Sequence, residues 1–231
     1  MKKTFDYIIA GGGSAGCTLA SRLCENKNIE VLLIEAGGSG KSLFTQMPGG
    51  NGYIFGNPKF DWGFESVPQP RLNNRKILYP RGKGLGGSSL LNGMIYMRGA
   101  SGDFNRWRQK GLKGWSYDDV LPYFKKSASA YHRKEGKYHS HSGPLKLSPA
   151  GNYNEIDEAF ISACVEAGSK INNDFYNESL NGVGRYDVKV WNGKRQSSAE
   201  AYLKFKPKNL TIYKNTSVIK ILFEKSKAIG L

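Results

Sequence analysis

The sequence predicts an α/β protein with a parallel sheet near its amino-terminal end, followed by the start of a smaller α+β part that we expect to be incomplete at the carboxyl end. Three observations predict this class. An apolar run at residues 7–10 precedes a glycine-rich turn and an amphipathic stretch, and a second apolar run follows at residues 29–34. A third apolar run, at residues 210–213, is also short enough for a buried strand. The 231 residues suffice for one large domain or two small ones.

The stretch from residue 5 to residue 37 combines a strand, a tight turn, a helix and a second strand. Gly11, Gly13 and Gly16 have G-x-G-x-x-G spacing. Glu35 lies about 20 residues beyond the last of these glycines, where a dinucleotide-binding βαβ unit carries the acid that binds a ribose. The stretch therefore predicts a Rossmann-like domain that binds FAD or NAD(P).

Each residue of this motif has an expected task. Gly11 permits the tight turn, Gly13 lets the backbone approach a pyrophosphate, and Gly16 lets the helix pack closely on the strand. Backbone N–H groups at the start of the helix then point at the anion. Glu35 is expected to accept hydrogen bonds from a ribose hydroxyl. Because FAD and NAD both contain adenosine diphosphate, the motif alone leaves the choice between them open.

Composition limits the classes of partner and site. The net charge is +15, but the lysines are scattered, so we expect a solvated basic surface and no nucleic-acid partner. No run approaches the roughly 20 apolar residues of a membrane span, and the first strand leaves no room for a signal peptide. We therefore expect a cytoplasmic protein, with a peripheral contact to anionic lipid of the inner membrane as the open alternative. The cysteines lack C-x-x-C spacing, and His139 and His141 lack a carboxylate or cysteine at ligand spacing, so we expect no metal site.

Residues 44–80 are dense in glycine, proline, asparagine and aromatic residues, without helical or strand periodicity. We expect a long loop that covers part of the domain surface. Its aromatic residues Phe60, Trp62 and Phe64 are expected to pack onto that surface.

A second glycine-rich turn lies within residues 80–105. It leads into Ser88 and Ser89, which we expect to cap a short helix that extends through Leu90 and Leu91 to Met94. Such a segment offers backbone N–H groups and hydroxyls to a second phosphate or a polar ring. By residue chemistry alone it is equally compatible with a structural crossover.

Further helices are predicted at residues 103–110, 116–126, 154–168 and, briefly, 197–205. Ser116 begins a capping-box pattern, and Asn154 is the expected cap of the third helix. In that helix the residues expected to face inward are Ile156, Phe160, Ile161, Cys164 and Val165.

The last third of the chain has strand patterns. Residues 186–190 alternate, and Asn192-Gly193 is a strong signal for a hairpin turn. After the strand at 210–213, we expect another at 218–223, with residues 228–231 opening its hairpin partner. A sequence that stops within a strand leaves an unpaired apolar edge. We therefore expect the chain to be the amino-terminal portion of something longer.

With both glycine-rich segments in view, the sequence resembles the glucose-methanol-choline (GMC) oxidoreductases, FAD enzymes that oxidise alcohols. Residues 5–37 are similar to the FAD-binding start of that family, and residues 82–105 to its first signature. The blocks WSYDDVLPYFKKS, HSGPLKL and NGKRQSSAEAYL follow in the order expected for the family.

The resemblance covers residues 1–231 and implies a division of the chain. The parts are a βαβ core at 5–37, a flavin-contacting segment at 80–105, part of the substrate domain at about 145–203, and a third sheet strand with the start of a β-meander at 210–231.

The same resemblance implies which residues bind FAD. The pyrophosphate is expected at the first glycine motif, the adenosine ribose at Glu35, and the adenine at the backbone of Val218. Leu91 stands where some members of the family carry a histidine bonded to the flavin, so we expect non-covalent FAD. The implied cofactor-binding residues are Gly11, Gly13, Ser14, Ala15, Gly16, Glu35, Ala36, Gly86, Gly87, Ser88, Asn92, Gly93, Met94 and Val218.

The implied reaction is FAD-dependent oxidation of a small, choline-like alcohol to the aldehyde, by hydride transfer to the flavin. The family's catalytic histidine and its partner lie in a carboxyl-terminal half that these residues do not include. His132, His139 and His141 do not match that site, so no catalytic residue is assigned.

Two alternatives stay open. One is an oxidoreductase of another doubly wound family, which does not predict the block at residues 82–105. The other is a non-catalytic flavin-binding remnant, or one half of a split enzyme whose carboxyl-terminal half is a separate partner.

Overall fold

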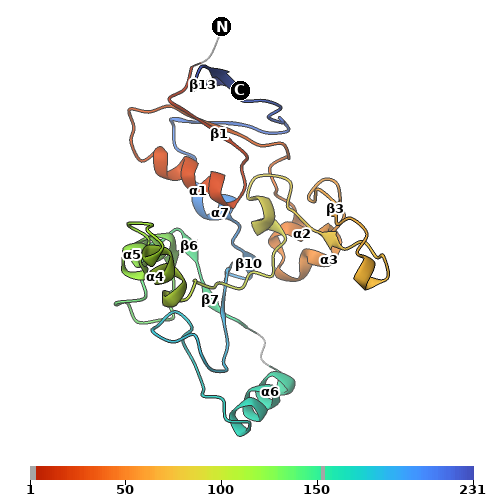
Figure 1. The fold of residues 1–231 in the computed structure, drawn as a ribbon, viewed down its shortest axis with the longest axis vertical. Helices are drawn as coiled ribbons and strands as arrows, with labels where there is room; N and C mark the ends of the chain where they lie inside the picture. The colour runs from red at the N-terminus through yellow and green to blue at the C-terminus, as the bar shows by residue number, and fades with distance from the viewer. Residues whose placement is uncertain (1–3, 152–153) are drawn as a thin grey trace. The chain divides into compact units, whose positions relative to one another are not determined.

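The computed structural model describes residues 4–151 and 154–231. The chain divides into two compact units (Figure 1). The first unit comprises the residues up to Gly93 together with Gly193–Leu231, and the second comprises Met94–Asn192.

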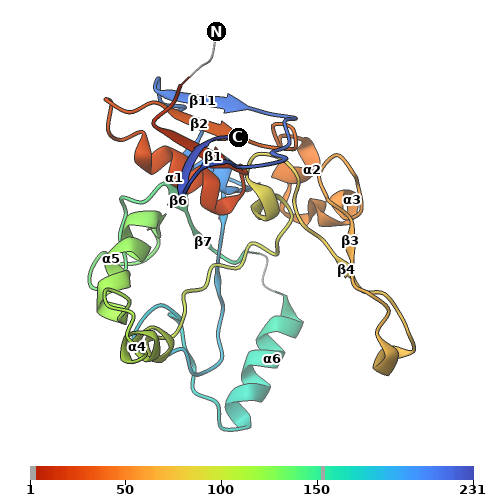
Figure 2. The same ribbon diagram turned by 45° about the horizontal axis from the view of Figure 1, so that its top comes forward.

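The first unit is built on a three-stranded parallel sheet with the order β1-β2-β11. The strands are β1 (Tyr7–Ala10), β2 (Val31–Ile34) and β11 (Leu210–Tyr213). Helix α1 (Ser14–Leu23) connects β1 to β2. Figure 2 shows the three strands side by side, with α1 against them. The predicted βαβ arrangement and the third strand are therefore confirmed.

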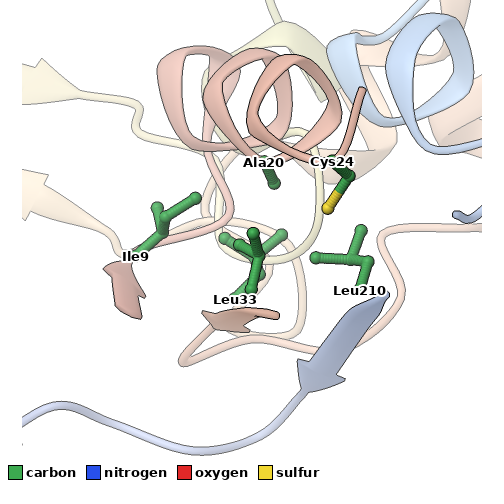
Figure 3. Packing of buried hydrophobic residues seen from close by; sticks show 6 residues of the cluster. Ile9, Ala20, Cys24, Leu33 and Leu210 are labelled. Carbon is green, nitrogen blue, oxygen red and sulfur yellow. The ribbon is translucent and has the colours of Figure 1, made fainter. Parts of the chain in front are cut away.

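The core of this unit lies between α1 and the sheet. Side chains from all four elements meet there, and Figure 3 shows Ala20 and Cys24 of the helical segment facing Leu33 and Leu210. All four residues of β2 are buried, as expected of the central strand of a parallel sheet. Helix α7 (Ser198–Tyr202), capped by Ser197, lies beside α1. This core fixes the positions of the loops that follow β1 and β2.

Residues 44–80 are more regular than the sequence indicates. Ser42 caps α2 in a capping box completed by the Thr45 hydroxyl, so a local polar pattern starts a helix where apolar periodicity is missing. Phe64–Glu65 and Leu78–Tyr79 pair as an antiparallel hairpin. The prediction of one long loop is therefore wrong. The elements are α2 (Leu43–Gln46), η1 (Pro48–Gly50), α3 (Asn51–Ile54), β3 (Phe64–Glu65), η2 (Pro70–Leu72) and β4 (Leu78–Tyr79).

The aromatic residues of this segment divide into two groups. Phe60 is buried in a small cluster with Ile54 and Leu91, as predicted. Trp62 and Phe64 are exposed and stack on one another with ring centroids 5.9 Å apart. The packing prediction is wrong for these two residues, because the hairpin presents them to solvent.

The carboxyl-terminal hairpin is shorter than predicted. Strands β12 (Leu222–Glu224) and β13 (Lys227–Gly230) pair antiparallel, whereas residues 218–221 are not in a strand. Ile219 is almost fully exposed. An apolar run forms a strand only where a neighbouring strand accepts its hydrogen bonds, and no described strand pairs with residues 218–221.

The second unit contains three predicted helices, and the structure confirms all three. Ser116 and Asn154 form capping boxes at the starts of the second and third helices. A core of Tyr96, Ala128, Ala130, Leu147 and Tyr176 lies elsewhere in the unit. The elements are α4 (Ser101–Gln109), α5 (Tyr117–Ser127), β5 (Ala128–Ser129), β6 (Leu145–Lys146), β7 (Ser148–Pro149), α6 (Glu155–Glu166), β8 (Asp187–Val188) and β9 (Val190–Trp191).

The inward face predicted for α6 is wrong. Ile156 and Phe160 are 78% and 65% exposed, and no residue of this helix is fully buried. Periodicity identified the helix, but it carries no information on whether another element covers the apolar face.

The turn at Asn192-Gly193 is confirmed, since both residues have the positive φ that a type I′ turn requires. It precedes β10 (Lys194–Arg195). Among the described residues, no helix is long and apolar enough to cross a bilayer.

Candidate cofactor site

The first glycine motif forms a tight turn at the carboxyl end of β1. Gly11 has φ +97°, a conformation that glycine adopts without strain, and its N–H donates to Ile34 O at 2.8 Å. A Cβ on Gly16 would lie 1.9 Å from Gly11 O. Gly16 was predicted to let the helix pack closely on the strand, and the tightest contact of its added Cβ is instead the Gly11 carbonyl of the turn, with Ile9 of the strand at 3.5 Å.

The amino terminus of α1 is open. No side chain caps the helix, and no acidic residue lies in its first turn. The backbone N–H groups of Ser14, Ala15 and Gly16 have no acceptor within the described part of the chain. A Cβ on Gly13 would meet nothing within 4 Å. This arrangement leaves backbone donors and free space together, which suits an anionic group such as a pyrophosphate.

Glu35 is buried, and its carboxylate links three glycine-containing segments. Oε2 accepts from Gly12 N at 2.8 Å, and Oε1 accepts from Gly37 N at 2.7 Å and from Gly84 N at 3.0 Å. Sequence reasoning predicted a ribose ligand here and missed these backbone contacts. A carboxylate has about four lone-pair positions, so three such bonds leave capacity for one ribose hydroxyl. Ala36, next in the chain, is half-buried.

The second glycine-rich segment lies against the first. Gly86 N donates to Gly12 O at 2.8 Å, and a Cβ on Gly87 would be 2.7 Å from Gly13 Cα. The fold therefore brings together two motifs that are about 70 residues apart in the sequence. They meet where β1 and β2 end, which is where ligands bind in open α/β sheets.

The predicted serine-capped helix is wrong. Only a short 3-10 helix, η3 (Gly87–Leu90), forms, and the backbone beyond it is not helical, with φ −131° at Leu91 and +63° at Met94. Ser88 Oγ accepts from Gly82 N at 3.1 Å. Ser89 Oγ donates to Gly86 O at 2.5 Å and accepts from Ser198 N at 2.9 Å. Both hydroxyls thus fix the loop rather than cap a helix.

The remaining residues predicted to bind the cofactor differ in their burial and in the compact unit to which they belong. Asn92 is half-buried and accepts hydrogen bonds from Arg195, while Gly93 is exposed with open space around it. Met94 has φ +63° and is the first residue of the second unit, so it is not grouped with the others. Val218 is half-buried. The segment just before it joins the site, because Thr216 N donates to Glu35 O at 3.0 Å and Asn215 N to Gly37 O at 2.9 Å.

Cys17, on the first turn of α1, also contacts the motif. Its thiol donates to Gly12 O at 3.0 Å, and burial raises the pKa of that thiol to about 11. Cys17 is therefore protonated near neutral pH and acts as a small hydrogen-bonded core residue.

The histidines take part in contacts within the second unit. His132 pairs with Asp187 at 2.9 Å, and His139 Nε2 lies 2.7 Å from an Asp174 oxygen. His141 Nε2 lies 2.9 Å from Arg133 O. Across residues 4–151 and 154–231, no three His, Cys, Asp or Glu side chains cluster as metal ligands would.

Known proteins resemble this chain along nearly all of its length. Residues 5–231 match a family described as GMC oxidoreductase. The chain is 42% identical over 228 residues to an oxygen-dependent choline dehydrogenase of Rhizobium etli, covering 98% of this chain and 41% of the relative. It is 43% identical to a protein of the same name from Vibrio vulnificus, covering 100% and 42%. The chain thus spans about two fifths of the length of the curated relatives that it matches.

Solved structures agree on the fold. Pyridoxine 4-oxidase from Mesorbium loti superposes with a TM-score of 0.91 at 30% identity, covering 97% of this chain and 45% of that one. An FAD-dependent oxidoreductase from Chaetomium thermophilum gives 0.88 at 30% identity, covering 98% and 41%. The fold is thus that of the Rossmann-like, FAD-binding amino-terminal part of such proteins. On these matches, the chain belongs to the GMC oxidoreductase family.

Proposed function

We propose that this chain is the part of an FAD-dependent alcohol dehydrogenase that binds FAD non-covalently, and that the complete enzyme oxidises a choline-like alcohol to the aldehyde. The observation that carries the proposal is the open amino terminus of α1, where free backbone donors and an unobstructed Gly13 lie beside the Glu35 carboxylate. The names of the relatives support choline as the type of alcohol.

The residues present fit the cofactor. The N–H groups of Ser14, Ala15 and Gly16 would hold the pyrophosphate, and the remaining lone pair of Glu35 would bind the adenosine ribose. Gly11 permits the tight turn, and Gly13 leaves space for the pyrophosphate. Ala36 and the backbone of Val218 would contact the adenosine. The residues proposed to line the flavin ring are Gly86, Gly87, Ser88, Asn92, Gly93 and Met94.

The character of Leu91 supports the proposal of non-covalent attachment. This side chain is aliphatic, buried and packed against Ile54 and Phe60. It offers no nucleophile to the flavin at the position where some family members carry a histidine.

When bound, the flavin supplies the hydride acceptor for alcohol oxidation, and the protein must supply a group that takes the hydroxyl proton. His132, His139 and His141 are each bonded to neighbours within the second unit, and we assign none of them as this base. We propose that the base belongs to the part of the relatives that this chain does not match.

The short span relative to its relatives also favours a second candidate. A chain that covers 41% of a choline dehydrogenase could be a flavin-binding remnant without activity, or one half of a split enzyme. In both cases FAD binding is retained and alcohol oxidation by this chain alone is not.

The test is a flavin-binding and bleaching experiment on the purified 231-residue chain. We expect the chain to retain FAD on desalting, to retain no NAD, and to release all flavin into the supernatant on acid precipitation. Flavin that stays with the precipitate would contradict non-covalent binding, and a colourless protein would contradict FAD binding. Choline added without oxygen is expected to leave the flavin colour unchanged, whereas bleaching would show that the catalytic base lies in this chain.

A further inference from the structure

Arg195, the last residue of β10, is a buried cation, as is Arg98 of the second unit. Only 2% of its surface is exposed. Its Nη1 donates to Asn92 O at 2.5 Å and to Asn92 Oδ1 at 3.2 Å, and its Nη2 donates to Asn51 Oδ1 at 2.5 Å. The guanidinium therefore fixes both the backbone and the side chain of Asn92 through contacts that span more than 100 residues of sequence.

Within residues 4–151 and 154–231, the positive charge of Arg195 has no negative partner. No ion pair to a carboxylate is formed with it among the described residues, and its buried Nε has no hydrogen-bond acceptor. Arg133 provides the contrast, since its guanidinium forms two hydrogen bonds with the Asp187 carboxylate at 2.7 and 2.9 Å. Burying a charge without a counter-ion destabilises the folded state, because the ion loses its hydration. A fold tolerates such a cost most readily where the charge serves a ligand.

The position of Arg195 indicates which ligand this is. Asn92 lies two residues after the end of the 3-10 helix η3, and the start of η3, at Gly86 and Gly87, lies against Gly12 and Gly13 of the first glycine motif. A dinucleotide whose pyrophosphate binds at α1 would extend its second ring along this segment. The uncompensated charge of Arg195 thus contacts Asn92, one of the residues proposed to line the flavin.

We propose that Arg195 is a positioning residue for the flavin, which holds Asn92 in place and supplies the positive charge that favours the anionic ring formed on reduction. This inference rests on the proposed function. The physical basis is that charge near a flavin tunes its electronics, and that a fixed cation in a poorly solvated site acts more strongly than one in water.

Two variants separate the charge from the structural contacts. Arg195→Met removes the guanidinium. Asn51→Asp keeps it and places a carboxylate on the atom that Nη2 already contacts, which neutralises the charge while adding an ion pair. Asn74→Asp, at an exposed position, introduces the same charge as a control.

The readout is sulfite binding to the FAD-loaded chain. Sulfite adds to the flavin ring and leaves negative charge on it, so its affinity reports positive charge nearby. We expect sulfite affinity to fall at least tenfold in Arg195→Met and several-fold in Asn51→Asp, with no change in Asn74→Asp. Asn51→Asp should also raise the thermal midpoint of the ligand-free chain, because it supplies the missing counter-ion.

The outcomes distinguish the inference from the function. A chain that binds no FAD contradicts the proposed function and the inference together. FAD binding with no sulfite adduct in the wild type, or with equal sulfite affinity in Asn51→Asp, contradicts the inference alone. A lower thermal midpoint in Asn51→Asp would show that the charge of Arg195 is already compensated, and would also overturn it. If Arg195→Met does not fold, Asn51→Asp decides the question.

Discussion

In the second unit the carboxylates Asp187 and Asp174 bind cationic side chains, and the buried Arg98 donates to Tyr138 O beneath aromatic rings. In the first unit, strong polar groups lie beside the glycine motifs without a charged partner among the described residues. Asp187 binds Arg133 and His132, and Asp174 binds His139. In the first unit, by contrast, the N–H groups at the start of α1 are open and Arg195 lacks a counter-ion. Unmatched polar groups are costly, so their concentration beside the glycine motifs indicates a surface organised for a ligand.

The most severe test of the first unit is Gly16→Ala. The added Cβ would lie 1.9 Å from Gly11 O, a backbone atom that cannot move without breaking the turn. We expect the free energy of unfolding to fall by about 3 kcal/mol or more, with loss of FAD binding. Gly52→Ala adds the same methyl group where nothing lies within 4 Å, and its denaturation midpoint should remain near that of the wild type.

The paired charges of the second unit predict a comparable loss for Asp187→Asn. The half-buried Arg133 would lose its hydrogen-bonded carboxylate and keep only Asp174, whose oxygen lies 3.8 Å away, at a cost of about 3 kcal/mol in urea denaturation. Asp118→Asn, at an exposed position, is the matched control. A loss no larger than that of the control would show that this pair adds little to stability.

The same pair predicts a dependence of stability on pH. Burial alone would raise the pKa of Asp187, but hydrogen bonds from His132 and Arg133 outweigh it and hold that pKa below the usual range. Because the folded-state pKa is depressed, the stabilisation is present above the unfolded-state value of about 4 and is lost as pH falls through the folded-state value. Acid titration of wild type and Asp187→Asn, followed by circular dichroism, should show that the variant loses this contribution.

A smaller loss of stability is expected when the hydrogen bonds that the Glu35 carboxylate accepts are disturbed. Glu35→Gln replaces one acceptor oxygen by an NH2 group, which faces a backbone N–H and cannot accept its hydrogen bond. We expect the free energy of unfolding to fall by about 1–3 kcal/mol. FAD affinity should fall about tenfold, because the segments joined by this carboxylate form the proposed FAD-binding site. Glu30→Gln, at an exposed acid, serves as the control in the same titration. Equal stability and equal FAD affinity of the two variants would mean that the three hydrogen bonds of Glu35 are not needed for folding or for FAD binding.

The smallest effect concerns Cys17. With its thiol pKa raised to about 11 by burial, roughly one molecule in a thousand carries a thiolate at pH 8. We expect no alkylation of Cys17 in the folded chain over the time in which the half-buried Cys164 reacts, as read by peptide mass spectrometry. Rapid labelling of Cys17 would show that the first turn of α1 opens in solution.

The sequence predicted the parts of this molecule that depend on local pattern. The spacing from Gly11 to Glu35 predicted a strand, a turn, a helix and a second strand within one short stretch. The capping-box residues Ser116 and Asn154 predicted where two helices begin. Adding the block at residues 82–105 also identified the family.

What sequence reasoning missed depends on contacts between distant residues. The backbone partners of Glu35 at Gly84 and the bond from Arg195 to Asn51 join segments that no periodicity relates. The exposed face of α6 has the same origin, because an apolar stripe does not specify what covers it. The wrong helix at Ser88 arose because serine favours caps in general, whereas here the hydroxyls of Ser88 and Ser89 bond to other parts of the loop and to Ser198.

The most direct test of the central claim is an FAD titration of the chain against Gly13→Ala, followed by quenching of flavin fluorescence. Gly13 has an extended backbone with φ −73°, and its Cβ would meet no protein atom, so this variant should fold like the wild type. We expect the added methyl group to block the pyrophosphate and to weaken FAD binding at least tenfold, while Gly52→Ala binds FAD as the wild type does. Equal affinity of Gly13→Ala and wild type would contradict the claim that FAD binds at the start of α1.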